Sequence, residues 1–152
     1  MKTFLALFAL AAAAAAGVRT AAVQDVTVVK PGDVKWVDAK GHPKGVQSCL
    51  IHGDPTKEAF VLMLKAPAGT VYPPHLHSAD EVVTIVSGAF MIGEGEKIDE
   101  AKGTTVEAGG YFSLKAKTPH WGKVVKDIVA VRYGNGKADI MYCNPADDPS
   151  KK

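Results

Sequence analysis

The chain has no surplus of charge of either sign. Its 152 residues include 18 lysines and arginines against 16 aspartates and glutamates. Setting aside Lys2 and Arg19, which flank an apolar run near the start, leaves 16 of each sign. This balance argues against nucleic acid as a partner and against a polybasic hold on membranes.

Cysteine is scarce, which excludes a disulfide-rich scaffold. The two cysteines, Cys49 and Cys143, lie far apart in the chain. In an oxidising compartment they could join, and closing so long a loop would stabilise the fold by about 4 to 5 kcal/mol in the chain-entropy model. Two unbridged thiols are the alternative, and the sequence leaves both open.

No apolar run is long enough to cross a membrane with ease. The longest extends from Phe4 to Ala16, follows Lys2, and is succeeded by small residues. This pattern predicts a secretory signal peptide over residues 1–22, cleaved after Ala22 or near Ala16, and a periplasmic or secreted protein without membrane contact after cleavage. An uncleaved anchor helix is the alternative. The remaining residues, 23–152, suffice for one domain with a core of its own.

The rest of the chain lacks helical periodicity, internal repeats and low-complexity linkers. Short segments rich in β-branched and aromatic residues alternate with glycine and proline, which predicts an all-β antiparallel sandwich or barrel. The expected strands cover residues 26–29, 48–52, 59–66, 81–88, 89–93, 111–116, 122–125, 127–133 and 138–143.

The stretch "PPHLHSADE", residues 73–81, places two histidines and a glutamate close together. Pro73 and Pro74 favour an extended backbone, and in a strand residues two apart face the same side about 6.6 Å from each other. His75 and His77 can therefore point to one place, and Glu81 opens the next expected strand. Imidazole and carboxylate ligands of this kind suit zinc, copper, manganese, iron or nickel.

A further histidine, His120, follows a proline at the end of an expected strand. Because an antiparallel barrel brings distant strands together, His120 is the expected fourth ligand. His42 and His52 lie in polar, turn-like surroundings and are interpreted as surface residues. Asp80 is interpreted as a turn residue that would replace Glu81 only if the alignment were shifted. The aromatic residues Tyr72 and Trp121 are expected in the core, with a cavity wall as the alternative.

These residues resemble the cupin superfamily. Gly69, His75, His77, Glu81 and Gly88 match every fixed position of its first motif. The second motif is matched less well: Gly109 and His120 agree, while Lys115 stands for the usual proline and Lys117 for the usual glycine. Many small exported cupins also resemble this chain beyond the motifs, but carry a histidine where it has Val82.

The resemblance implies a jelly-roll β-barrel with one divalent metal held by His75, His77, Glu81 and His120, and it makes a homodimer an expectation. It does not imply one reaction. A dioxygenase, decarboxylase or isomerase acting on a small molecule is the favoured interpretation, with a non-catalytic small-molecule or metal-binding barrel as the alternative. The sequence shows no serine or cysteine triad, phosphate-binding glycine loop or dinucleotide fingerprint.

Overall fold

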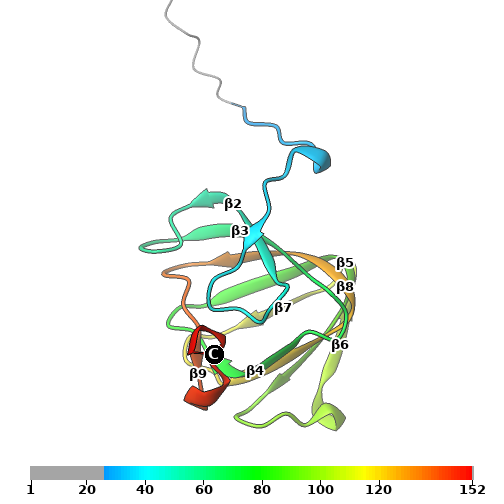
Figure 1. The fold of residues 1–152 in the computed structure, drawn as a ribbon, viewed down its shortest axis with the longest axis vertical. Helices are drawn as coiled ribbons and strands as arrows, with labels where there is room; N and C mark the ends of the chain where they lie inside the picture. The colour runs from blue at the N-terminus through cyan, green and yellow to red at the C-terminus, as the bar shows by residue number, and fades with distance from the viewer. Residues whose placement is uncertain (1–25, 152) are drawn as a thin grey trace, which may run out of the picture.

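Nine β-strands form one antiparallel sheet in the computed structural model, which describes residues 26–151 (Figure 1). The strands are β1 (Val37–Asp38), β2 (Gln47–Gly53), β3 (Phe60–Ala66), β4 (Val71–Leu76), β5 (Glu81–Glu94), β6 (Thr104–Glu107), β7 (Tyr111–Leu114), β8 (His120–Gly134) and β9 (Met141–Tyr142). Four 3-10 turns complete the described elements: η1 (Pro31–Asp33), η2 (Glu100–Lys102), η3 (Pro145–Asp147) and η4 (Pro149–Lys151). No helix in this part of the chain is long and apolar enough to cross a membrane.

Strands β5 and β8 pair over most of their length and connect the two halves of the barrel. The first half of β8 lies between β4 and β5, and its second half lies between β3 and β5. Strands β7 and β6 pair with the other edge of β5. Figure 1 shows the resulting sheet curling upon itself. The predicted all-β antiparallel jelly-roll barrel is confirmed.

A bulge at Gly88 bends β5 where the sequence predicts a turn. The pairing of β5 with β8 is irregular between Ile85 and Phe90, yet the strand continues through it. Gly88 has a φ of +82°, and a Cβ there would lie 2.1 Å from the carbonyl oxygen of Asp127. Only glycine meets both requirements without strain. The prediction of two strands over residues 81–88 and 89–93 was therefore wrong, as was the division of β8 at residue 126.

Other segments also differ from the expected strands. Strand β1 lies outside the expected ranges, as does β4, which was anticipated only as an extended backbone at its prolines. Residues 26–29 are exposed and unpaired, although valines dominate them. Strand β9 keeps only two residues of the segment predicted over 138–143. Strand β6 was missed because three of its four residues are polar, so no alternation of apolar residues marks it.

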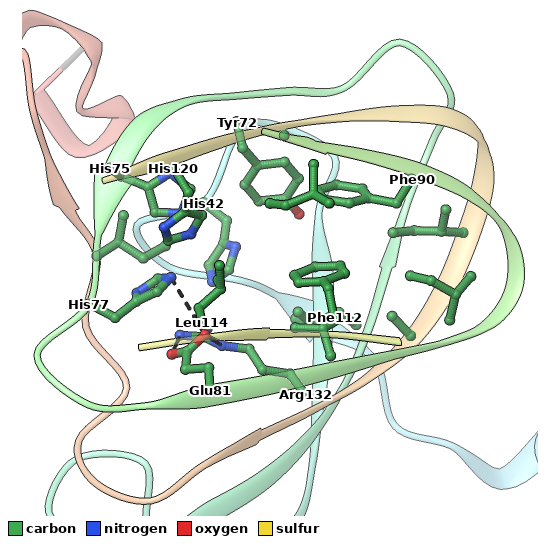
Figure 2. Close-up of a pocket in the computed structure, with 18 residues that line it drawn as sticks. His42, Tyr72, His75, His77, Glu81, Phe90, Phe112, Leu114, His120 and Arg132 are labelled. Atoms are coloured by element: carbon green, nitrogen blue, oxygen red, sulfur yellow. Dashed lines mark hydrogen bonds and ion pairs between the residues drawn. The ribbon is translucent and has the colours of Figure 1, made fainter. Parts of the chain in front are cut away.

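The core lies between the two halves of the barrel. Eight buried residues form its main cluster: Val46, Ala66, Tyr72, Ile85, Phe90, Val124, Ile128 and Ala130. Phe112 from β7 stacks on Phe90 from β5, with ring centroids 5.7 Å apart. Trp121 is 1% exposed, which confirms its interpretation as a core residue. The stacked Phe90 and Phe112 lie in the interior away from the histidines (Figure 2).

Cys49 on β2 and Cys143 after β9 are free thiols in the structure. Of the two alternatives, the structure thus has the unbridged pair. The predicted signal peptide, residues 1–22, lies outside the described residues.

Candidate metal centre

Three imidazoles meet at one end of the barrel interior (Figure 2). His75 lies on β4 and pairs in register with His120, the first residue of β8, while His77 follows the end of β4. Candidate ligand atoms of these three residues all lie within 4.8 Å of one another. All three side chains are buried. Strand pairing therefore brings together residues that are 45 positions apart in the sequence.

The backbone fixes the tautomer of each imidazole. His75 Nδ1 donates to the carbonyl oxygen of Pro73 at 2.7 Å, and His120 Nδ1 donates to that of Thr118 at 2.9 Å. His77 Nδ1 donates to the carbonyl oxygen of Asp139. A carbonyl oxygen can only accept, so each Nδ1 carries the hydrogen and each neutral Nε2 keeps a free lone pair. This arrangement orients ligating histidines in known metal sites.

Burial keeps these imidazoles neutral at physiological pH. Loss of solvent lowers the pKa of His75 to about 3, with the positive charge that His120 would carry as the next cause. Loss of solvent, followed by the charge of Arg132, lowers the pKa of His77 to about 3. Desolvation also lowers the pKa of His120, although its hydrogen bond to Thr118 acts in the opposite direction. Neutral imidazole is the form that binds metal.

The metal-free protein should lose stability in mild acid. A histidine whose pKa is near 3 when folded and about 6.5 when unfolded binds a proton only on unfolding between those values. Its contribution is complete above pH 6.5 and decreases as the pH falls toward 3, by up to about 1.4 kcal/mol per pH unit for each such histidine. Urea unfolding with chelator at pH 7.5 and pH 5 should show a clear fall in the free energy of unfolding. Equal values at both pHs would contradict the buried neutral state.

Glu81 lies beside the three histidines but outside their group. One of its oxygens, Oε2, is 3.5 Å from His77 Nε2 and accepts a hydrogen bond from Arg132 Nε at 2.7 Å. The other oxygen, Oε1, accepts from Arg132 Nη2. Both side chains are buried, 2% and 5% exposed. The carboxylate is thus held by a two-pronged arginine contact, which Figure 2 shows below the histidines.

Arg132 was missed by the sequence analysis, although a signal for it exists. In the second half of β8, Ile128 and Ala130 face the core at alternate positions, and Arg132 continues that series. A buried arginine requires a partner, because an isolated charge in the interior is costly. Alternation along the strand would therefore have pointed to an inward-facing arginine and to an acidic partner within the barrel.

His42 is a site residue, and its interpretation as a surface histidine was wrong. It lies in the loop between β1 and β2, and its ring meets Tyr72 edge-on with centroids 5.9 Å apart. Burial, followed by the charge of Arg132, lowers its pKa to about 3. Its Nδ1 is buried and has no hydrogen-bond partner among the described residues. The loop looks polar in sequence, but it folds over the open end of the barrel. His52, by contrast, is exposed as predicted.

The altered second motif still forms its turn before His120. Lys117 adopts a φ of +63°, the left-handed conformation that glycine would enter without cost, and its N–H donates to the carbonyl oxygen of His77 at 2.8 Å. Lys115 pairs with Asp80 at 3.0 Å, and the Asp80 carboxylate also accepts from the N–H of Ala116 at 2.8 Å. Asp80 is thus a turn residue, as predicted. The turn that leads to His120 therefore forms although lysines stand at both of these motif positions.

Two cavities lie next to each other at this end of the barrel. The inner cavity, about 60 Å³, is lined by the three histidines, Glu81 and mostly apolar core residues. The second cavity is about 230 Å³ and has a more polar wall. Four residues line both cavities: His42, Leu64, Arg132 and Ile140. The inner cavity has room for about two water molecules.

Residues 24–121 match the sequence model of the family described as the ChrR cupin-like domain. That match covers more than half of the chain and includes His75, His77, Glu81 and His120. A search of curated proteins found no match.

Several solved structures share the fold. The polyketide cyclase RemF from Streptomyces resistomycificus is 15% identical with a TM-score of 0.63, and the match covers 83% of this chain and 91% of that one. An RmlC-like cupin from Ralstonia eutropha is 22% identical with a TM-score of 0.58 and coverages of 82% and 76%. The anti-sigma factor ChrR of Rhodobacter sphaeroides, solved in complex with SigE, is 22% identical with a TM-score of 0.52, and the match covers 70% of this chain and 51% of that one. At these identities the likeness concerns the fold alone.

Proposed function

This chain belongs to the ChrR cupin-like domain family, and we propose that it holds one divalent transition metal through His75, His77 and His120. The convergence of three buried neutral imidazoles, each oriented by its Nδ1–H, carries the proposal. Nitrogen ligands of this kind fit zinc, copper, nickel, iron or manganese, and three of them leave coordination positions open for water or a ligand.

Zinc or copper is the proposed native ion. The predicted signal peptide has no twin-arginine pair, so the chain would cross the membrane unfolded and acquire its metal outside the cytoplasm. There the order of intrinsic affinities favours copper and zinc over iron and manganese. Iron as the dominant ion in protein purified from its native compartment would contradict this order.

Glu81 was predicted as a fourth ligand, and its contact with Arg132 competes with that role. Both carboxylate oxygens already accept hydrogen bonds from the guanidinium. We expect Glu81→Gln to change the affinity for zinc by less than about tenfold, since the three histidines remain. Competition titration with a chromophoric chelator measures this affinity. A loss of a hundredfold or more, with one zinc still bound to the wild-type protein, would assign Glu81 as a ligand.

An enzymatic role on a small molecule is the proposed use of the metal. The bound ion would supply Lewis acidity or a position for oxygen. Arg132 would keep the Glu81 carboxylate oriented beside His77, and the apolar wall of the inner cavity would exclude bulk water. Fold neighbours include a polyketide cyclase and DMSP lyases, which supports catalysis in this fold without indicating the reaction here. A turnover screen of small carboxylates and phenols with the zinc and copper forms tests this role.

A non-catalytic metal-binding barrel is the second candidate, and the size of the inner cavity favours it. About 60 Å³ is far below the roughly 300 Å³ at which small-molecule pockets begin. An organic substrate would therefore need the neighbouring cavity as well. Retention of metal without turnover of any compound in the screen would support this candidate.

A small-molecule partner and a homodimer stay as predictions. Size-exclusion chromatography with light scattering tests whether the protein is a dimer.

A further inference from the structure

The larger cavity beside the metal centre is lined by segments from both ends of the described chain. It extends from the loop before β2, at residues 39–42, to the C-terminal segment at residues 138–150. Tyr142 on β9 donates to the carbonyl oxygen of Gly41 at 3.0 Å and joins the two segments. The cavity is therefore a partly open hollow at this end of the barrel, and its volume of about 230 Å³ exceeds that of the inner cavity.

His42 and Arg132 form part of the partition between the two cavities. No hydrogen bond to another described residue satisfies His42 Nδ1, although the atom is buried. Arg132 uses Nε and Nη2 for Glu81. Buried polar groups in folded proteins are nearly always paired, so the unpaired His42 Nδ1 in this partition points to a ligand.

The charge of the metal-loaded centre favours an anion. Glu81 and Arg132 neutralise each other, and imidazoles that donate from Nδ1 and ligate through Nε2 carry no charge, so a divalent ion would leave these groups with an uncompensated double positive charge. Buried charge is costly unless it is paired. A ligand with one negative charge would reduce the excess.

Charged groups at the outer wall do not reverse this preference. Lys40 lines the cavity, as do Asp139 and Asp148. Asp139 accepts a hydrogen bond from the N–H of Ser78 at 2.9 Å. Asp148 accepts from the N–H and the hydroxyl of Ser150, and lies 3.8 Å from Lys151 Nζ. Both carboxylates thus have donors of their own. Asp139 also contacts the histidine group, because its main-chain carbonyl accepts from His77 Nδ1, whereas Asp148 lines only the larger cavity.

From these observations we infer that the larger cavity binds a small organic carboxylate, whose anionic end is held at the partition by His42 and Arg132. The inference rests on the proposed metal centre, because the ion supplies the charge that selects an anion. It assigns a ligand class and two recognition residues to the site.

Benzoate and its neutral isostere benzamide provide the test. The protein is titrated first with zinc, and the zinc form is then titrated with each compound at pH 7.5 by ¹H–¹⁵N NMR and calorimetry. We expect benzoate to shift the amide signals of Ser48, Ala138 and Ser150 and to bind at least tenfold more tightly than benzamide. The metal-free protein should bind benzoate at least tenfold more weakly than the zinc form.

Two variants separate the cavity from the metal. His42→Phe keeps the ring shape without its nitrogens and should weaken benzoate binding to the zinc-loaded protein about tenfold. The matched control is the exposed histidine, His52→Phe, which should leave benzoate binding unchanged. Ala138→Phe fills the larger cavity from a wall that the inner cavity does not share, and it should abolish benzoate binding but retain zinc.

The outcomes distinguish the two proposals. Failure to bind zinc in the first titration overturns the metal centre and, with it, this inference. Zinc binding without benzoate binding, equal binding of benzoate and benzamide, or unchanged benzoate affinity in Ala138→Phe overturns the carboxylate site alone.

Discussion

Replacement of His77 by alanine should weaken zinc binding by about 1,000-fold, equivalent to ~4 kcal/mol, and leave the barrel folded. The variant removes one of only three converging imidazoles. The main core cluster does not include His77, so the strands retain the packing that holds them together. Zinc titration monitored by calorimetry gives the affinity, and circular dichroism of the metal-free variant gives the fold.

His52→Ala is the matched control, because His52 is exposed and lies outside the histidine group. It should bind zinc as the wild-type protein does. Unchanged zinc affinity and stoichiometry in His77→Ala would refute its assignment as a ligand.

Substitution of Arg132 by methionine should destabilise the protein by about 3–5 kcal/mol and lower its Tm by roughly 10–20 °C. The change leaves the Glu81 carboxylate buried without its bidentate partner, in a place where both side chains are at most 5% exposed. Most of this loss in the free energy of unfolding comes from leaving the Glu81 charge buried without a partner. The net stabilisation by the ion pair itself contributes much less. Urea unfolding of the metal-free protein measures the loss.

Two comparisons make this result specific. Adding Glu81→Gln to the Arg132→Met variant removes the charge and should recover part of the lost stability. Lys115→Met breaks an exposed ion pair with Asp80 and should cost less than about 1 kcal/mol. If Arg132→Met were no more destabilising than Lys115→Met, the buried Glu81 carboxylate would not depend on Arg132 to compensate its charge.

The pair of His75 and His77 could be anticipated because its determinants are local: the two residues are two positions apart in an extended segment. His120 was expected beside them only because an antiparallel barrel brings distant strands together, and the register of β8 against β4 places it opposite His75. The apolar strands could be anticipated for the same reason, since the alternation of apolar and polar residues is visible within short stretches of sequence. The assignment of these residues as metal ligands stays a prediction.

What the sequence did not reveal depends on contacts between distant segments. The Arg132–Glu81 contact joins residues 51 positions apart, and His42 becomes partly buried only when its loop packs against Tyr72. The bulge at Gly88 depends on the carbonyl of Asp127 on the neighbouring strand. Cavity volume is the least local property of all, because every wall residue contributes to it. No pattern in a single stretch determines any of these.

Strand β8 carries His120 near its beginning and Arg132 near its end, and both reach the same interior although the sheet bends between them. They are an even number of residues apart, so the alternation of side chains keeps them in phase. Loss or gain of a single residue at the exposed bend, residues 125–127, would turn Arg132 outward and bring Tyr133 inward while His120 kept its place. Insertions and deletions among homologues should therefore be absent at residues 125–127 or change the length by two residues. If a homologue tolerates a change of one residue there, His120 and Arg132 need not face the same interior.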